Sequence, residues 1–324
     1  MIDLATAGWP FFGFHPRAFN PWSGVLEPGT AAPAGGAFLP GRFDSDFRSL
    51  DYKLYVPAGY RDAPAPLPLV VMLHGCGQSA ADFALGTGMN VLAEEAQCLV
   101  LYPEQSCEAN WNRCWNWYDA AHHERDGGEP ALIAALTRSL VAHYGVDDAR
   151  VSVAGLSSGG AMAVILGRTY PDLFRAVGCH SGLAHGSATD GQSAMAAMRD
   201  GADPAALKKT TPLASIPIIV FHGDEDHTVH QKNSSDVVQQ TIECHLAQFA
   251  GQARDVAIHE ETGEAAGRCF TRHTHRDGTG GVIAEHWTIH GTGHAWSGGN
   301  AHGSYTDARG PDASREMLRF FIQA

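Results

Sequence analysis

Short apolar runs alternate along the chain with longer segments of mixed polarity, and this alternation predicts the fold. Uninterrupted runs such as Leu69–Leu73 are typical of strands buried on both faces of a sheet. We expect strands near residues 52–56, 69–73, 98–102, 150–154, 175–179, 216–221, 268–274 and 282–289. We expect helices between them, near residues 80–96, 130–143, 158–169, 190–200, 233–249 and 312–322. Strands that alternate with helices form parallel βαβ units, so the predicted fold class is α/β, with a doubly wound, mostly parallel sheet flanked by helices.

One serine lies where a predicted strand meets a predicted helix. Ser157 stands in the run Gly155-Leu156-Ser157-Ser158-Gly159. The two glycines allow a turn that is too tight for residues with a Cβ, and a strained backbone there lifts the serine hydroxyl clear of the sheet. Strand, sharp turn and helix around Gly-x-Ser-x-Gly are the signature of a nucleophile elbow. We therefore predict that Ser157 is a catalytic nucleophile.

A carboxylate and a histidine follow in the order that such a hydrolase needs. Asp226 follows one predicted strand, and His294 lies in a Gly-rich loop after a later one. Serine, then aspartate, then histidine is the triad order of α/β-hydrolases. We predict Asp226 as the acid and His294 as the base. Asp224 and Glu225 are rivals for the acid, and His222 is a lesser rival for the base because it precedes the acid.

A Gly-rich loop also follows the apolar run at residues 69–73. In folds with this elbow, such an early loop lends one backbone N–H to the oxyanion hole, and the residue after the nucleophile lends another. We predict the N–H groups of Cys76 and Ser158 as these donors. Loss of one donor typically costs about 3 kcal/mol of transition-state stabilisation. The alternative is an ordinary Gly-rich turn.

Several aromatic residues near these motifs could line a substrate site. They are Trp115, Trp117, Tyr118 and Trp296. Trp296 is two residues from the predicted base, and a flat apolar ring suits acyl or aryl groups. For Trp115 and Trp117 the alternative is that they fill the core beneath the loop.

Length and charge limit the remaining possibilities. The 324 residues suit one large α/β domain, which we place at residues 46–324. Residues 1–45 are predicted to be an extended N-terminal arm. Four aromatic side chains would pack this arm on the surface: Trp9, Phe11, Phe12 and Trp22. A net charge of −13 with no Lys/Arg cluster argues against nucleic acid as a partner, and no apolar run approaches the roughly 20 residues of a membrane span.

Eighteen histidines raise the question of a metal site. His273 and His275 alternate on one predicted strand, and His286 and His290 follow in the next. No His-x-x-x-His pair on a helix accompanies a glutamate base, as a zinc hydrolase would require. We expect scattered surface or hydrogen-bonded histidines, and neither a metal nor a cofactor.

Seven cysteines leave at least one thiol free. No Cys-x-x-Cys pair indicates zinc or redox chemistry, and Cys98 is expected to be a buried free thiol. We predict at least one disulfide, with Cys76–Cys114 and Cys244–Cys269 as preferred pairs and Cys107–Cys114 as a competitor of the first. This usage favours an oxidising compartment, secreted or periplasmic, although the first 40 residues lack the basic start and long apolar core of a signal peptide.

A set of short motifs extends from about residue 50 to the end of the chain. They are His74-Gly75-Cys76-Gly77-Gln78, Tyr102-Pro103-Glu104-Gln105, Cys114-Trp115-Asn116-Trp117-Tyr118, Gly155-Leu156-Ser157-Ser158-Gly159-Gly160, Ser181-Gly182-Leu183, His222-Gly223-x-x-Asp226-x-x-Val229 and Gly293-His294-Ala295-Trp296-Ser297-Gly298-Gly299. Together they resemble the esterase family that includes polyhydroxybutyrate depolymerases and feruloyl esterases. The resemblance implies an α/β-hydrolase fold and places the triad on Ser157, Asp226 and His294.

This chain departs from the family pattern at two places. Ser297 stands where the pattern suggests proline, and Cys179 and His180 replace less polar residues before Ser181. Both departures lie near the predicted site. They bear on the choice of substrate and leave the predicted chemistry unchanged.

These observations predict a serine carboxylic ester hydrolase that works through an acyl-enzyme. The segment at residues 182–211 is polar and Ala-rich, unlike the apolar cap of a lipase, so we expect short-chain hydroxyalkanoate esters or polyesters as substrates. A feruloyl or other aryl or carbohydrate esterase is the alternative within this class. A serine peptidase of the same fold would usually carry a propeller or a larger lid, and a non-catalytic polymer-binding module would tolerate a lost triad residue. The sequence does not address the oligomeric state.

Overall fold

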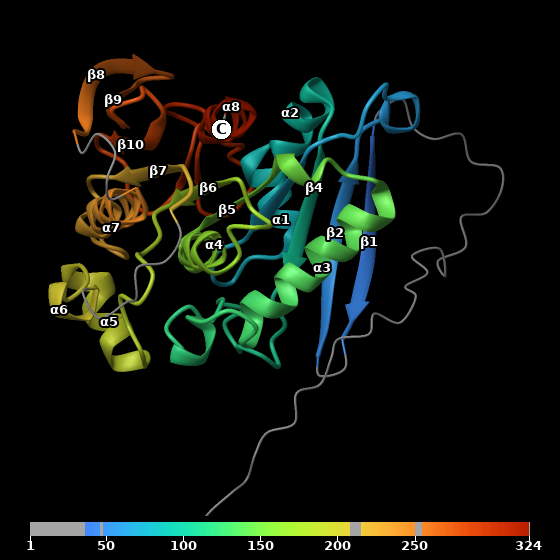
Figure 1. The fold of residues 1–324 in the computed structure, drawn as a ribbon, viewed down its shortest axis with the longest axis horizontal. Coiled ribbons are helices and arrows are strands. Elements are labelled where there is room, and N and C mark those ends of the chain that lie inside the picture. Colours follow the sequence, from blue (N-terminus) through green and yellow to red (C-terminus); the bar gives the residue numbers. More distant parts are fainter. Residues whose placement is uncertain (1–35, 46–47, 208–214, 250–254, 324) are drawn as a thin grey trace, which may run out of the picture.

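A ten-stranded sheet spans the protein, and helices cover both of its faces (Figure 1). The computed structural model describes residues 36–45, 48–207, 215–249 and 255–323. The strand order is β1-β2-β4-β3-β5-β6-β7-β10-β9-β8. The strands are β1 (Ala37–Asp44), β2 (Ser49–Val56), β3 (Leu69–Leu73), β4 (Leu99–Glu104), β5 (Val151–Leu156), β6 (Ala176–His180), β7 (Ile218–Gly223), β8 (Ala257–Ala265), β9 (Arg268–Arg276) and β10 (Val282–Ile289). A separate pair, β11 (Trp296–Ser297) and β12 (Thr306–Asp307), lies in the C-terminal loops.

The centre of the sheet is parallel and its two edges are antiparallel. Strands β4, β3, β5, β6, β7 and β10 run in one direction. Strands β1 and β2 extend one edge in antiparallel pairing, and β9 and β8 extend the other. The central strands β3, β5, β6 and β7 are buried along their whole length, as their apolar runs predict. The predicted α/β-hydrolase fold, a doubly wound and mostly parallel sheet, is confirmed.

Two layers of helices enclose this sheet. The core on one face includes side chains of α3 (Gly128–Tyr144), α4 (Ser158–Thr169), α5 (Gly191–Asp200) and α7 (Lys232–Gln248). The core on the other face includes side chains of α1 (Ala80–Thr87), α2 (Met89–Ala96) and α8 (Ala313–Gln323). A short helix, α6 (Pro204–Leu207), follows α5. Figure 1 shows the sheet crossing the molecule from β8 to β1 between these helices.

The predicted helix near residues 80–96 is two helices. Gly88 separates α1 from α2, with a φ of 62° that favours glycine. Its N–H donates to Ala84 O and so caps α1. The sequence did not predict this break, because the Ala- and Leu-rich residues on both sides favour one continuous helix and a single left-handed residue changes the summed helix propensity little.

The two outer strands β1 and β8 were not predicted. Strand β8 is exposed along most of its length, so it lacks the alternation of apolar and polar residues that marks a half-buried strand. Strand β1 contains Pro40 and Gly41 and lies within the segment predicted as an arm, yet it pairs with β2 in register. Proline is tolerated there because β1 is an edge strand. The sheet therefore begins inside residues 1–45, whereas Trp9, Phe11, Phe12 and Trp22 lie outside the described residues.

The strand order places two loops side by side at one end of the sheet. From β3 the chain moves outward to β4 and then returns to form β5 on the other side of β3. Open α/β sheets bind ligands at such a reversal, outside the carboxyl ends of the strands. The loop after β3 and the turn after β5 therefore meet at this end. None of the described helices is both long and apolar enough to cross a membrane.

Candidate active site

Ser157 occupies a strained turn between β5 and α4. Its φ of 57° and ψ of −118° lie in a region that non-glycine residues rarely adopt. A Cβ on Gly155 would lie 2.3 Å from Gly159 O, and a Cβ on Gly159 would lie 2.1 Å from Leu73 O. Both positions of the Gly-x-Ser-x-Gly pattern therefore exclude a side chain, and the helix start lies directly against β3. The turn has the geometry of the predicted elbow.

Asp226 and His294 form a short hydrogen bond at the same end of the sheet. His294 Nδ1 donates to Asp226 Oδ2 at 2.6 Å. The other carboxylate oxygen, Oδ1, accepts the N–H groups of Thr228 at 2.9 Å and Val229 at 2.8 Å. The Asp226 side chain is completely buried. The carboxylate therefore fixes the ring of His294 and leaves its Nε2 free for another partner.

A second histidine keeps this carboxylate charged. His222 Nε2 lies 2.7 Å from Val229 O and 3.3 Å from Asp226 Oδ2, so its proton lies on Nε2 and faces both oxygens. Burial would raise the pKa of Asp226, but the hydrogen bonds from His222 and His294 and the electrostatic interaction with His294 outweigh burial and hold that pKa far below its usual range. Asp226 is thus ionised at neutral pH. His222 is buried, and its Nε2 is directed at this carboxylate and at Val229 O.

Asp224, the main rival for the acid, contacts a different histidine. Its Oδ2 accepts from His290 Nδ1 at 2.8 Å, and its Oδ1 accepts from Gly291 N at 2.7 Å. Glu225, the other rival, has an exposed side chain, and its N–H donates to Thr292 O at 3.1 Å. These contacts join the loop after β7 to the loop after β10. Both rivals therefore hold the loop of His294 in place, and only Asp226 contacts His294 itself.

The two predicted oxyanion donors are adjacent and unpaired. Among the described residues, no hydrogen-bond acceptor faces the N–H of Cys76 or that of Ser158. The neighbouring N–H groups are occupied, since Gly77 N donates to Asn112 O at 2.7 Å and Ser157 N donates to His180 O at 2.8 Å. Cys76 Sγ lies 3.4 Å from Ser158 Oγ, which places the two residues side by side. Two free N–H groups beside a nucleophile elbow can receive a substrate oxygen.

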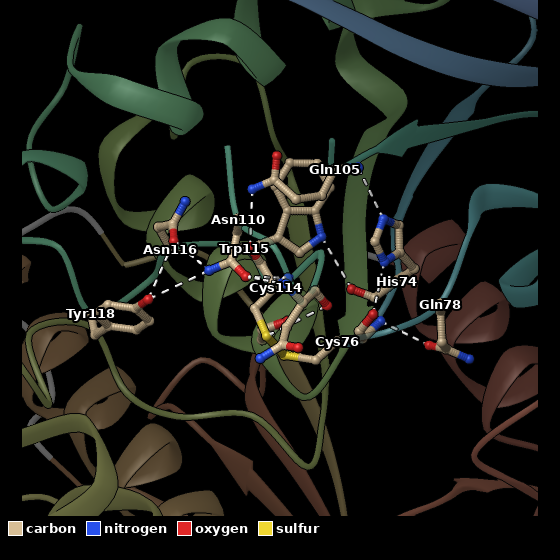
Figure 2. Close-up of a disulfide and its surroundings, with 12 residues drawn as sticks. His74, Cys76, Gln78, Gln105, Asn110, Cys114, Trp115, Asn116 and Tyr118 are labelled. Carbon is tan, nitrogen blue, oxygen red and sulfur yellow. Dashed lines mark hydrogen bonds between the residues drawn. A yellow bond between two sulfur atoms is a disulfide. The ribbon is translucent and has the colours of Figure 1, made fainter. Parts of the chain in front are cut away.

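The structure contains the predicted disulfide between Cys76 and Cys114 (Figure 2). It joins the loop after β3 to the loop that follows β4. The competing pair is excluded, because Cys107 is a free thiol. Cys98 is a buried free thiol as predicted, and burial raises its pKa to about 12.

The predicted pair Cys244–Cys269 is wrong, because both thiols are free. Cys244 lies on α7 and interacts with the charge of Arg168 on α4. Cys269 lies on β9, exposed, opposite Glu264 of β8. The two residues therefore belong to different surroundings, which their common location near loops in the sequence did not reveal.

Buried polar groups hold the loop after β4, which contains Cys114. Gln105 N donates to His74 Nε2 at 3.0 Å, and Trp115 Nε1 donates to His74 O at 3.1 Å (Figure 2). The carboxylate of Glu129, buried on α3, accepts from Gln105 Nε2 at 2.6 Å and from Asn116 N at 2.8 Å. Buried charges and amides that are fully hydrogen-bonded favour one conformation. These hydrogen bonds therefore fix the loop that the disulfide joins to Cys76.

The structure does not place the predicted aromatic wall around a substrate. Trp296 is 1% exposed, stacks on His180 and donates its Nε1 to Ser314 Oγ at 3.1 Å. Trp115 and Trp117 are core residues, and Tyr118 is half-buried. Proximity in sequence to the base misled the prediction for Trp296, because its strand β11 directs the ring into the core.

Two other aromatics are exposed beside the loop that contains Cys76. Trp111 is 83% exposed and Tyr305 is 54% exposed. Trp111 precedes Asn112, whose carbonyl accepts from Gly77. Tyr305 follows Ser304, whose carbonyl accepts from Gln78 Nε2 at 3.0 Å. The exposure of Trp111 could have been predicted from the sequence, because it lies between two asparagines and asparagine is common in exposed turns.

Three of the four histidines considered as metal ligands have hydrogen-bond partners, and His290 is the partner of Asp224 described above. His273 Nε2 lies 3.0 Å from Glu260 Oε2, and His286 Nε2 lies 2.9 Å from Ser234 Oγ. Over the described ranges, no three His, Cys, Asp or Glu side chains are grouped so that they could hold a metal ion.

Comparisons with known proteins agree on one family. Residues 50–264 match the family described as Esterase PHB depolymerase. The chain is 32% identical to poly(3-hydroxyalkanoate) depolymerase C of Paucimonas lemoignei over 251 aligned residues. This alignment covers 74% of this chain and 57% of that protein. It is 36% identical to feruloyl esterase B of Neurospora crassa over 132 aligned residues. This alignment covers 40% of this chain and 43% of that protein. The chain thus spans about half the length of these relatives.

A solved structure supports the fold. Acetyl xylan esterase from Aspergillus awamori superposes with a TM-score of 0.59 at 20% identity, over 85% of this chain and 94% of that chain. At this identity the likeness concerns the fold alone.

The cysteine assignment predicts a defined alkylation pattern. Unreduced protein alkylated in denaturant should carry five modified thiols, and reduction should expose two more, because only Cys76 and Cys114 are paired. Peptide mapping by mass spectrometry would identify the linked peptides. Seven modified thiols before reduction would show that the disulfide is absent.

Proposed function

Because this chain belongs to the Esterase PHB depolymerase family, we propose that it is a serine carboxylesterase that works through an acyl-enzyme on Ser157. The observation that carries the proposal is the 2.6 Å hydrogen bond from His294 to the buried, ionised Asp226, at the same end of the sheet as the strained turn of Ser157. An ionised carboxylate fixes the tautomer of the base and stabilises its charged form. Ser157, Asp226 and His294 are the proposed triad.

The proposed reaction follows from this arrangement. His294 Nε2 takes the proton of the Ser157 hydroxyl as its oxygen attacks the ester carbonyl, and returns that proton to the leaving alcohol. Water then attacks the acyl-enzyme, with His294 again as base, and releases the acid. The described residues show no hydrogen bond between Ser157 and His294, and such contacts commonly tighten only once substrate is bound.

The negative oxygen of each tetrahedral intermediate would lie between two N–H groups. We assign this role to Cys76 and Ser158, because their N–H groups are unpaired while those of Gly77 and Ser157 are not. The disulfide from Cys76 to Cys114 would keep the first donor in place during the reaction. Preorganised donors of this kind are among the largest contributions to acyl-transfer catalysis.

The substrates proposed are short-chain hydroxyalkanoate esters or polyesters. The depolymerase relative supports this class, as does the polar, Ala-rich segment from Gly182 onward. Trp111 and Tyr305 would offer apolar contact at the surface, in place of the buried tryptophans. The feruloyl esterase relative makes aryl esters the second candidate.

Replacement of Ser157 by alanine should abolish hydrolysis of p-nitrophenyl butyrate. We expect a loss of at least about 10³-fold in kcat with an unchanged circular dichroism spectrum, because no other group supplies the nucleophile. Steady-state kinetics would measure it. A folded variant that keeps more than a few per cent of wild-type turnover would show that Ser157 is not the nucleophile, and failure of the wild type itself would favour a binding module or a peptidase.

The two neighbouring aspartates should respond very differently to the same substitution. Asp226→Asn should lower kcat by about 10⁴-fold, because it removes the charge that holds the tautomer of His294. Asp224→Asn, the matched control, should cost less than about tenfold, because Asp224 contacts His290 and Gly291 only. Equal losses, or the reverse order, would assign the acid to Asp224.

The acyl preference should peak at short chains. An open site without an apolar lid adds little binding energy per methylene beyond the first few, whereas a continuing pocket would add about 0.8 kcal/mol for each. We expect kcat/KM for p-nitrophenyl esters to be highest between acetyl and butyryl. Methyl ferulate, hydroxybutyrate oligomers and an amorphous polyester film complete the panel. A value that rises steadily to dodecanoyl would reveal a deep acyl tunnel.

A further inference from the structure

His180 lies at the centre of the sheet between the nucleophile and the base. It ends β6, the strand between β5 and β7, and its side chain is completely buried. The ring stacks on Trp296 at 5.0 Å and on Phe221 at 5.8 Å between centroids. A less polar side chain would fill this space equally well, so the imidazole needs an explanation.

Two hydrogen bonds connect His180 to both parts of the proposed triad. Its carbonyl accepts from Ser157 N at 2.8 Å, which fixes the backbone of the elbow. Its ring Nε2 accepts from Ser297 N at 3.0 Å. Ser297 follows His294 by three residues on the same loop. One residue therefore links the turn that carries the nucleophile to the loop that carries the base.

The ring is in the state that this link requires. Because Nε2 accepts from Ser297, the proton lies on Nδ1, which is 3.1 Å from Ser181 Oγ. Burial, together with the electrostatic interactions with the neighbouring His222 and His294, lowers the pKa of His180 to about 3. Protonation would destroy the acceptor, so a neutral ring keeps the link intact at neutral pH.

The second partner, Ser297, contributes its backbone N–H separately from its hydroxyl. The hydroxyl donates to Pro311 O at 2.8 Å, and the residue is fully buried. Proline at this position would have no N–H to donate. The hydrogen bond to His180 therefore depends on the backbone of residue 297 and not on its hydroxyl.

We propose that His180 and Ser297 form a positioning pair that sets the base loop against the nucleophile elbow, a role that rests on the function proposed above. The pair does not touch substrate. It acts through His294, whose ring must reach the Ser157 hydroxyl when the ester binds. Misplacement of a reacting group by about 1 Å is enough to cost about 100-fold in rate.

A double-mutant cycle tests the pair. His180→Phe keeps a ring between Trp296 and Phe221 but leaves the Ser297 N–H without a partner, and Ser297→Pro removes that N–H beneath an intact imidazole. Each single change should lower kcat for p-nitrophenyl butyrate by about 10- to 100-fold, with KM within about twofold. The double variant should recover to within about fivefold of wild type, because removal of both partners of a buried hydrogen bond leaves nothing unpaired.

Two control variants separate this bond from its neighbours. Ser297→Ala removes only the hydroxyl bond to Pro311, and Ser181→Ala removes only the partner of His180 Nδ1. Both should lose less kcat than His180→Phe and Ser297→Pro, because both keep the Ser297 N–H and its acceptor on His180. Thermal unfolding of every variant shows whether it folds. Additive losses in the double variant, or a loss in KM with kcat intact, would overturn the pair and leave His180 as a core residue.

A measurement on the wild type covers the case in which a variant does not fold. Nitrogen NMR of the histidine rings should show His180 as the neutral tautomer protonated at Nδ1, from pH 8 to pH 5. A proton on Nε2, or a charged ring in this range, would contradict the pair. Labelling of Ser157 by a serine-directed phosphonate tests the proposed function separately, so a failed cycle in a labelled enzyme counts against the pair alone.

Discussion

The close contact between the start of α4 and strand β3 is the constraint on which the site depends. Gly159 lies so near Leu73 O, and Gly155 so near Gly159, that neither position accepts a side chain. This contact accompanies the positive φ of Ser157 and brings the loop after β3 beside the turn after β5. The unpaired N–H groups of Cys76 and Ser158 become neighbours for the same reason. The strain at one residue is thus compensated by the packing of a helix on the sheet.

Electrostatics organises the other half of the site. Burial of a carboxylate is unfavourable unless hydrogen bonds compensate it, and Asp226 receives two from backbone N–H groups and others from His222 and His294. The histidines around it thereby acquire separate roles. His294 binds the carboxylate through Nδ1 and keeps Nε2 for the proposed reaction, whereas His222 is directed at the carboxylate. The buried His180 stays neutral. Three histidines that are far apart in the chain and close together in the fold thus differ through their surroundings.

The strongest sequence patterns were those of buried strands and of Gly-rich turns. Strands β3 and β10 have the predicted bounds, and the elbow, the Asp226–His294 pair and the disulfide at Cys76 were all predicted. The exposed edge strands β1 and β8 were missed, because an edge strand needs no apolar face.

The sequence did not predict the directions in which side chains point. Trp296 was predicted at the substrate because it is two residues from His294, and it is buried because β11 turns its ring inward. Cys244 and Cys269 were paired on the basis of loop position alone, whereas the fold places them in different surroundings. The link from His180 to Ser297 joins residues 117 positions apart, and only the packed structure shows it.

The central claim is that one serine in the strained turn carries the acyl group. Rapid acid quenching during turnover of a slow aryl ester, followed by peptide mass spectrometry, would locate the covalent intermediate. The account predicts a single acyl adduct on the peptide that contains Ser157, which disappears in Ser157→Ala. An adduct on another residue, or turnover without any adduct under burst conditions, would contradict it.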